Sequence, residues 1–147
     1  MNSKDFDTVE LETQRELESL LTEFGRLVDN GRADQVHELF TSDGSIRGPG
    51  LAMQTQAEIR EKFTERAADK NRVSRHFWSN PYFERVDEET IRLSTVVQTF
   101  VHSLAEKEQL PAPANTFVVG DSVDVFKFCS DKKWRFQSRE LTVIFRN

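Results

Sequence analysis

Three histidines and one cysteine are the side chains of this 147-residue chain best suited to proton transfer or metal binding. A histidine titrates near neutral pH, so it can serve as a general acid or as a general base. Alternation along a strand places His76, Trp78 and Asn80 on one face of an aromatic-rich segment. We therefore expect these three side chains to line a pocket together.

The same residues give no sign of a metal site. His37 and His102 have no ligand-like spacing with His76, and Cys129 has no metal-binding partner in the sequence. Because Cys129 is the only cysteine, no disulfide can form within the chain. The Gly-Pro-Gly segment at 48–50 lacks the context of a phosphate-binding loop. We predict no metal and no cofactor.

Composition and charge are those of an ordinary folded protein. Hydrophobic residues make up 37% of the chain and include 12 phenylalanines, enough to build a core. The net charge is −5 and basic residues are interleaved with acidic ones, so we expect no binding to nucleic acid or to a membrane. Residues 1–5 are polar and no apolar stretch follows them, so we expect no signal peptide and a cytoplasmic location.

The first half of the chain reads as three helices. In the first, apolar residues recur every three or four positions from residue 8 onward, until Asp29-Asn30-Gly31 ends the helix. A second, short helix covers 33–40 and leads into a turn at 41–44 and a brief strand at 45–47. The third covers 54–68, and Thr55 with Glu58 forms a capping-box pattern at its start.

The second half reads as four strands, at 73–83, 90–102, 117–129 and 134–145. Tight turns at 87–89 and 130–133 join the first pair and the last pair. The connection at 103–115 is long and polar and contains two prolines, which is typical of a lid or binding loop. Helices followed by hairpin-connected strands indicate one α+β domain over residues 1–147, in which a curved, mostly antiparallel sheet encloses a cone-shaped pocket.

Short motifs along the chain resemble those of the SnoaL-like families in the nuclear transport factor 2-like superfamily. They are Phe24 to Asp29 at the end of the first helix, the Leu39-to-Gly44 segment, Arg75-His76 with Asn80, and Trp134 to Arg139 in the last strand. The motifs follow in the family's order over roughly residues 10 to 146. The resemblance implies a cone-shaped roll. The superfamily includes dehydratases, isomerases and cyclases as well as non-catalytic members, so the resemblance by itself does not imply one reaction.

In dehydratases of this kind, an Asp, a His and an Arg act together, and the resemblance places them at Asp29, His76 and Arg139. The family's catalytic Tyr falls on Phe24, and a further acid would fall near Thr99, where no carboxylate occurs. Removing water across a carbon–carbon bond requires a base for the carbon acid and a donor for the oxygen, and a His oriented by an Asp can provide both functions. Phe24, Trp78, Asn80, Thr99 and Phe117 are the predicted substrate-binding residues.

Each of the three polar residues also has a purely structural interpretation. His76 is then a hydrogen-bonded strand histidine, Asp29 completes a helix-terminal turn, and Arg139 pairs with a nearby carboxylate. The sequence supports two hypotheses. In the first, the protein is a cofactor-independent dehydratase or isomerase that acts on a cyclic, largely apolar molecule. In the second, it is a non-catalytic binding or assembly module that resembles the small subunit of ring-hydroxylating dioxygenases.

The outer face of the predicted sheet is also apolar, for example at 123–128 and 141–145. Such a face is unfavourable in water, and homodimers are common in the superfamily that the sequence resembles. We therefore expect a homodimer, with a small apolar or aromatic ligand as the other partner.

Overall fold

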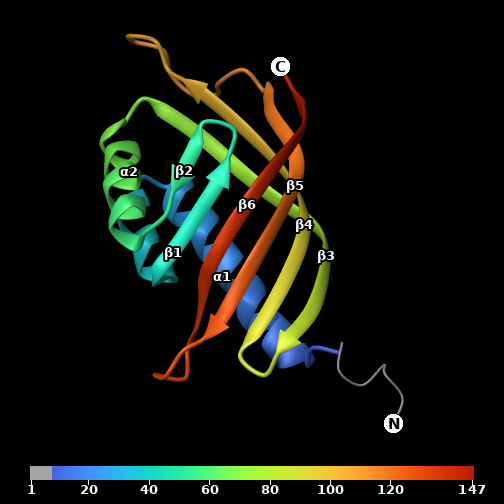
Figure 1. Cartoon of the computed structure of the whole chain (residues 1–147). Helices are drawn as coiled ribbons and strands as arrows, with labels where there is room; N and C mark the ends of the chain where they lie inside the picture. Colours follow the sequence, from blue (N-terminus) through green and yellow to red (C-terminus); the bar gives the residue numbers. More distant parts are fainter. Residues whose placement is uncertain (1–7) are drawn as a thin grey trace.

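A computed structural model describes residues 8–147. In chain order, the elements are α1 (Leu11–Asp29), the 3-10 helix η1 (Ala33–Leu39), β1 (Phe40–Gly48), β2 (Leu51–Met53), α2 (Gln56–Ala68), β3 (Arg72–Asp87), β4 (Thr90–Ser103), β5 (Thr116–Phe128) and β6 (Trp134–Arg146). The six strands form one sheet in the order β2-β1-β6-β5-β4-β3 (Figure 1). Neighbouring strands are antiparallel except β1 and β6, which are parallel. The predicted α+β class is confirmed.

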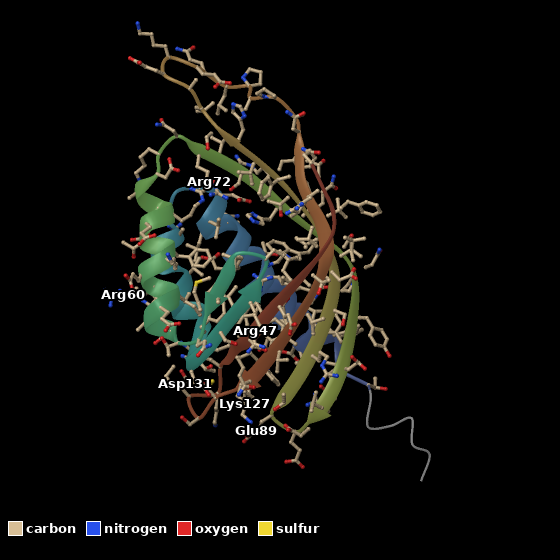
Figure 2. All side chains as sticks on the ribbon, turned by 45° about the horizontal axis from the view of Figure 1, so that its top comes forward. Arg47, Arg60, Arg72, Glu89, Lys127 and Asp131 are labelled. Carbon is tan, nitrogen blue, oxygen red and sulfur yellow. The ribbon has the colours of Figure 1, made fainter. Side chains whose placement is uncertain are left out.

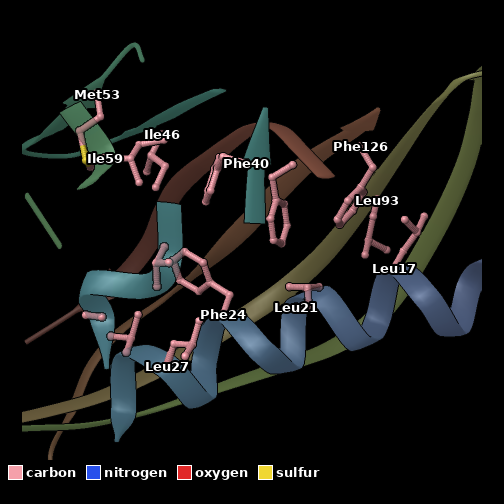
Figure 3. Close-up of a cluster of buried hydrophobic side chains, with 14 of the residues drawn as sticks. Leu17, Leu21, Phe24, Leu27, Phe40, Ile46, Met53, Ile59, Leu93 and Phe126 are labelled. Atoms are coloured by element: carbon pink, nitrogen blue, oxygen red, sulfur yellow. The ribbon is translucent and has the colours of Figure 1, made fainter. Parts of the chain in front are cut away.

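The core lies between α1 and the inner face of the sheet. Leu17 and Leu21 project from one side of α1 toward Leu93 of β4 and Phe126 of β5 (Figure 3). Phe24, on the same side of α1, packs against Phe40 of β1. These positions on α1 follow the three-to-four residue spacing of one helical face, which explains why the helix packs along the sheet. Burial of this face removes apolar surface from water and holds the C-terminal end of α1 against β3.

The sheet has six strands, whereas the sequence predicts four long strands and one brief strand. The expected brief strand at 45–47 is part of the longer β1, which forms a hairpin with β2 and pairs in parallel with β6, where Ile46 lies opposite Arg139. The predicted turn at 41–44 lies within β1, and an irregularity in the register between Phe40 and Ser45 accommodates its residues. Pairing with a strand almost a hundred residues later therefore overrides the local turn signal.

The N-terminus of α2 carries the predicted cap. The Thr55 hydroxyl accepts a hydrogen bond from the Glu58 backbone N–H at 3.1 Å, and the Glu58 carboxylate accepts one from the Gln54 backbone N–H at 2.6 Å. The first bond satisfies a backbone donor that a helix leaves free at its first turn, and the second ties the residue before the cap to the helix. The expected pattern is present, although the Glu58 carboxylate contacts Gln54 rather than Thr55.

The 104–115 connection extends from the end of the sheet between β4 and β5 (Figure 1). Its base is tied by Glu108, whose carboxylate contacts the His102 imidazole at 2.9 Å and the Ala105 backbone N–H at 2.7 Å. None of the helices in residues 8–147 is both long and apolar enough to span a bilayer. The expectation of no signal peptide concerns residues 1–5, which lie outside the described residues.

Candidate active site

Asp29 is the last residue of α1, and its carboxylate is held against β3 by three hydrogen bonds. Its Oδ1 lies 2.8 Å from Nδ1 of His76 and accepts the Ser74 hydroxyl at 2.7 Å. Its Oδ2 accepts the backbone N–H of His76 at 2.9 Å. Because Ser74 and His76 are two residues apart on β3, both side chains reach the carboxylate from the same face of the strand.

These contacts affect the charge of Asp29. Burial by itself raises the pKa of a carboxyl group, but the hydrogen bonds and the charge of His76, together with the Ser74 hydroxyl, outweigh it and lower the pKa of Asp29 below its usual value. Arg66 of α2 extends this network, since its Nη2 donates to the Ser74 hydroxyl at 3.1 Å. Asp29 is thus an ionised acceptor that orients the His76 ring through Nδ1.

The His76 ring is fixed on its other side by an aromatic stack. Its plane lies within 13° of the Trp78 indole, with ring centroids 5.6 Å apart. Nε2 makes no hydrogen bond within residues 8–147, and the His76 side chain is 19% exposed. An imidazole with Nδ1 held by a carboxylate and Nε2 available is the arrangement required for proton transfer to or from a ligand.

Arg139 of β6 lies in the same region and is paired with a carboxylate that the sequence analysis did not single out. Its Nε donates to Asp124 Oδ1 at 2.7 Å, and Nη2 lies 3.4 Å from Oδ2. Asp124 is fully buried; burial raises its pKa, and the Arg139 charge, with a hydrogen bond from Ser122, opposes that rise. The strand register places Asp124 directly opposite Arg139, which explains the pairing.

Aromatic rings surround the Arg139 guanidinium. Its carbon Cζ lies 4.1 Å from the centroid of the Phe24 ring, 4.8 Å from that of Phe136 and 5.5 Å from that of Trp78. Such contacts stabilise a cation over the faces of the rings. Nε and Nη2 are directed to Asp124, while Nη1 makes no hydrogen bond within the described residues. Nη1 is therefore the nitrogen of the Arg139 guanidinium that can donate to a ligand oxygen.

These side chains border a cavity of about 480 Å³ between α1, α2 and the inner face of the sheet, which we call the central cavity. Its inner wall includes Phe24, His76, Trp78, Thr99 and Arg139. Phe24 packs its edge against other rings of the core and leaves this space open. The volume is in the range of small-molecule sites.

Charged side chains surround the entrance to the central cavity. Arg47 and Arg72, which are exposed and labelled in Figure 2, lie at the cavity together with Lys62 and the acids Glu65 and Glu140. The interior is largely apolar, whereas the entrance carries charges of both signs. A ligand with an apolar ring system would fit the interior, and polar substituents would remain at the entrance.

A second cavity, of about 540 Å³, lies between α1 and the edge strand β3, and we call it the α1–β3 cleft. His76 and Trp78 line both cavities, so their stacked rings form the wall between them. The sequence predicts a single pocket, whereas the structure has this cleft as well as the central cavity.

The predicted substrate-binding residues are not all in the same place. Phe24, Trp78 and Thr99 line the central cavity, and Phe117 does so while remaining 51% exposed. Asn80 is exposed and lines neither cavity, because the β3–β4 register shifts between Ser79 and Tyr82 and Asn80 adopts a positive φ of 54°. Simple alternation therefore placed Asn80 incorrectly: a bulge turns its side chain toward solvent.

Three further residues of the site were missed, namely Ser74, Arg66 and Asp124. Ser74 and Asp124 each had a signal, since Ser74 shares a strand face with His76, and Asp124 lies on the apolar face of β5 with Phe126. Arg66 had none, because its contact depends on how α2 packs. Within residues 8–147, no three His, Cys, Asp or Glu side chains lie close enough together to hold a metal ion.

Comparison with solved structures shows the same fold in many proteins. A candidate scytalone dehydratase from Novosphingobium aromaticivorans aligns with a TM-score of 0.77 at 19% identity, covering 93% of this chain and 87% of the other. ActVI-ORFA from Streptomyces coelicolor aligns with a TM-score of 0.72 at 20% identity, covering 90% and 98%. A protein of N. aromaticivorans described as NTF2-like with a cystatin-like fold aligns with a TM-score of 0.71 at 22% identity, covering 91% and 83%.

No curated protein is significantly similar to the chain in sequence. The sequence profile of the SnoaL-like domain, in contrast, matches residues 9–140, which is nearly the whole chain. This match agrees with the resemblance found in the motifs and with the shared fold. The chain belongs to the SnoaL-like domain family.

Proposed function

We propose that the protein is a cofactor-independent dehydratase or isomerase that acts on a cyclic, largely apolar molecule in the central cavity. The observation that carries this proposal is the 2.8 Å contact between Asp29 and Nδ1 of His76, on a histidine that lines the same cavity as Arg139. Family membership and the fold shared with a candidate scytalone dehydratase support this reaction class.

For a cyclic β-hydroxy ketone, the three residues have distinct roles. His76 removes the proton on the carbon next to the carbonyl through Nε2, while Asp29 stabilises the imidazolium that forms. Nη1 of Arg139 donates to the carbonyl oxygen as it gains negative charge. The carbon–oxygen bond then breaks, and the hydroxyl leaves as water after taking the proton back from His76. The products are an unsaturated ketone and water.

The same groups serve an isomerisation when no hydroxyl is present. His76 then returns the proton to a different carbon of the enolate, and the double bond shifts without loss of water. The reaction class is therefore proton transfer next to a carbonyl group, and the substrate decides whether water leaves.

Turnover of a panel of cyclic β-hydroxy ketones and non-conjugated enones tests the proposal, with the conjugated product followed by its ultraviolet absorption. We expect His76→Asn to lower kcat by about 100-fold or more, the usual contribution of a general acid or base. His102→Asn is the matched control, because His102 also pairs with a carboxylate but lies outside both cavities. Equal turnover by the His76→Asn variant and the parent protein would remove His76 from the mechanism.

A second candidate is a module that binds an apolar ligand without converting it. Phe24 favours it, since this ring lies 4.1 Å from the Arg139 guanidinium and has no hydroxyl to donate. The Asp124 carboxylate also offsets the charge of Arg139. Under this proposal, ligands bind in the central cavity and remain unchanged after prolonged incubation, and His76→Asn alters affinity alone.

A further inference from the structure

Two residues that line the α1–β3 cleft each carry a buried polar group with no hydrogen-bond partner within residues 8–147. These groups are Nε1 of Trp78, a residue that also lines the central cavity, and the hydroxyl of Thr95. Thr95 is only 6% exposed. Buried polar groups are almost always paired in native proteins, so two such groups in one cleft require an explanation.

Strand register brings the two groups together. Trp78 of β3 lies opposite Val97 of β4, and Thr95 is the next residue of β4 on the same face. Trp78 and Thr95 are thus diagonal neighbours, a relation in which long side chains can reach a common point.

The bulge in β3 explains why the Thr95 hydroxyl has no hydrogen-bond partner in the part of the chain that the structure describes. Ser79 pairs with Val96, so an unbroken register would place Asn80 opposite Thr95. Instead the register shifts after Ser79, and Asn80 adopts a positive φ and is exposed. The amide that could have satisfied the Thr95 hydroxyl is directed to solvent, and the space beside the hydroxyl belongs to the cleft.

The indole is held in place by close packing against α1. A Cβ atom added at Gly25 would lie 2.8 Å from Cζ3 of Trp78, so the absence of a side chain at Gly25 lets the ring approach the helix. The stack with His76 fixes its plane. The Trp78 N–H is therefore a preorganised donor rather than a group free to turn toward another partner.

The chemistry of the two groups defines what they can bind. An indole N–H only donates, whereas a threonine hydroxyl both donates and accepts. A hydroxyl or carbonyl oxygen satisfies both groups at once. Leu21 and Leu93 supply apolar walls, and Glu18, Arg26 and Arg75 of the cleft are exposed. Asp29 also lines the cleft, but its carboxylate is already engaged by Ser74 and His76. We propose that the α1–β3 cleft is a second ligand site, in which Trp78 and Thr95 bind the neutral oxygen of an otherwise apolar ring compound.

The cleft is also lined by Asp29 and His76, so a ligand bound in it lies beside the pair to which the reaction above is assigned. The proposed site concerns binding alone, and it stands or fails independently of whether His76 is catalytic. Because His76 and Trp78 line both cavities, a ligand in the cleft contacts residues that also border the central cavity.

The test uses 2-naphthol and naphthalene, which share a ring system and differ by one hydroxyl. The chain has two tryptophans, so the two indole N–H signals in a proton–nitrogen correlation spectrum can be assigned with Trp134→Phe. We expect 2-naphthol to shift the Trp78 signal downfield in a saturable way, with Trp134 unaffected, and naphthalene to cause no downfield shift. Thr95→Val should weaken 2-naphthol binding about 10-fold, the effect of one hydrogen bond, and change naphthalene binding little.

Thr99→Val is the matched control, because Thr99 lies on the same face of β4 with similar burial but lines the central cavity. It should leave the Trp78 shift and the affinity for 2-naphthol unchanged. The proposal is overturned if Thr99→Val weakens 2-naphthol binding and Thr95→Val does not, or if the two compounds bind equally well. The spectra themselves show whether each variant is folded.

Discussion

Two ion pairs each place one member in the wall of the central cavity, namely His76 and Arg139, and the exposure of the two pairs differs. Asp29 and His76 keep some exposure, with side chains 7% and 19% exposed, whereas Asp124 is fully buried and the Arg139 side chain is 8% exposed. A pair that borders a cavity can exchange protons with a ligand, while a buried pair mainly holds its members in place. We therefore assign proton transfer to the first pair and positioning of Arg139 to Asp124.

The lowered pKa of Asp29 predicts a pH-dependent contribution to stability. A carboxyl whose pKa is lower in the folded state stabilises the fold above its ordinary value of 3.8, and the contribution is lost as pH falls through the folded value. We expect Asp29→Asn to lower the free energy of unfolding by about 1–3 kcal/mol at pH 7. Urea unfolding should show a smaller difference at pH 3.

Asp34→Asn provides the comparison, since Asp34 is exposed on η1 and lies outside the sheet. It should leave the free energy of unfolding nearly unchanged at both pH values. An effect of Asp29→Asn that is as large at pH 3 as at pH 7 would contradict a role for the ionised carboxylate.

Breaking the buried pair should be more costly than replacing it. Asp124→Leu leaves the Arg139 charge buried without its carboxylate, and we expect a loss of about 3–5 kcal/mol in the free energy of unfolding. The double variant Asp124→Leu with Arg139→Met should recover much of that loss, because no unpaired charge remains. A double-mutant cycle by urea denaturation measures the coupling, and simple additivity of the two single changes would contradict it.

Among the elements, α2 depends on its cap because little of it is buried. Only Ile59 and Ala67 of this helix are buried. We expect Thr55→Ala to lower the free energy of unfolding by about 1 kcal/mol, because it removes the acceptor for the Glu58 backbone N–H. Thermal unfolding measures the effect.

Thr64→Ala is a suitable control for that prediction. Thr64 is exposed within the same helix, so the change should be neutral or slightly stabilising. Equal effects at Thr55 and Thr64 would contradict a role for the Thr55 hydroxyl as the cap of α2.

At the scale of the whole molecule, the outer face of the sheet carries an apolar surface. It includes Phe77, Val96, Phe100, Val119 and Val123, which alternate with the inward-facing residues of β3, β4 and β5. Phe77 is 56% exposed and packs edge-on against Phe100. Such a surface is unfavourable in water, and we propose that a second copy of the chain covers it.

Analytical ultracentrifugation tests this dimer. We expect the parent protein to sediment as a dimer and Val123→Glu to sediment largely as a monomer, because a charge on the apolar face opposes burial. Glu61→Lys, an exposed change on α2, should leave the dimer intact. A parent protein that remains monomeric at high micromolar concentration would contradict the proposal.

The order of helices and strands could be read from the sequence because it depends on local periodicity. Spacing of three to four predicted α1, and alternation predicted β3 to β6, since each pattern reflects which side of an element faces the core. The motif resemblance also pointed to Asp29, His76 and Arg139. These three residues lie on α1, β3 and β6, which the helical spacing and the strand alternation had already predicted.

The pairing of the site residues and of the strands could be seen only in the tertiary structure, because it depends on contacts between residues that are distant in the sequence. Asp29 meets His76 across 47 positions, Arg139 is matched with Asp124 by the register of β5 and β6, and β1 joins β6 instead of remaining a brief strand. The bulge at Asn80 removed one expected residue from the pocket and left Thr95 facing the α1–β3 cleft. Register, bulges and helix packing arise when the whole core is assembled, so local patterns determined the elements of this protein and not how their side chains meet.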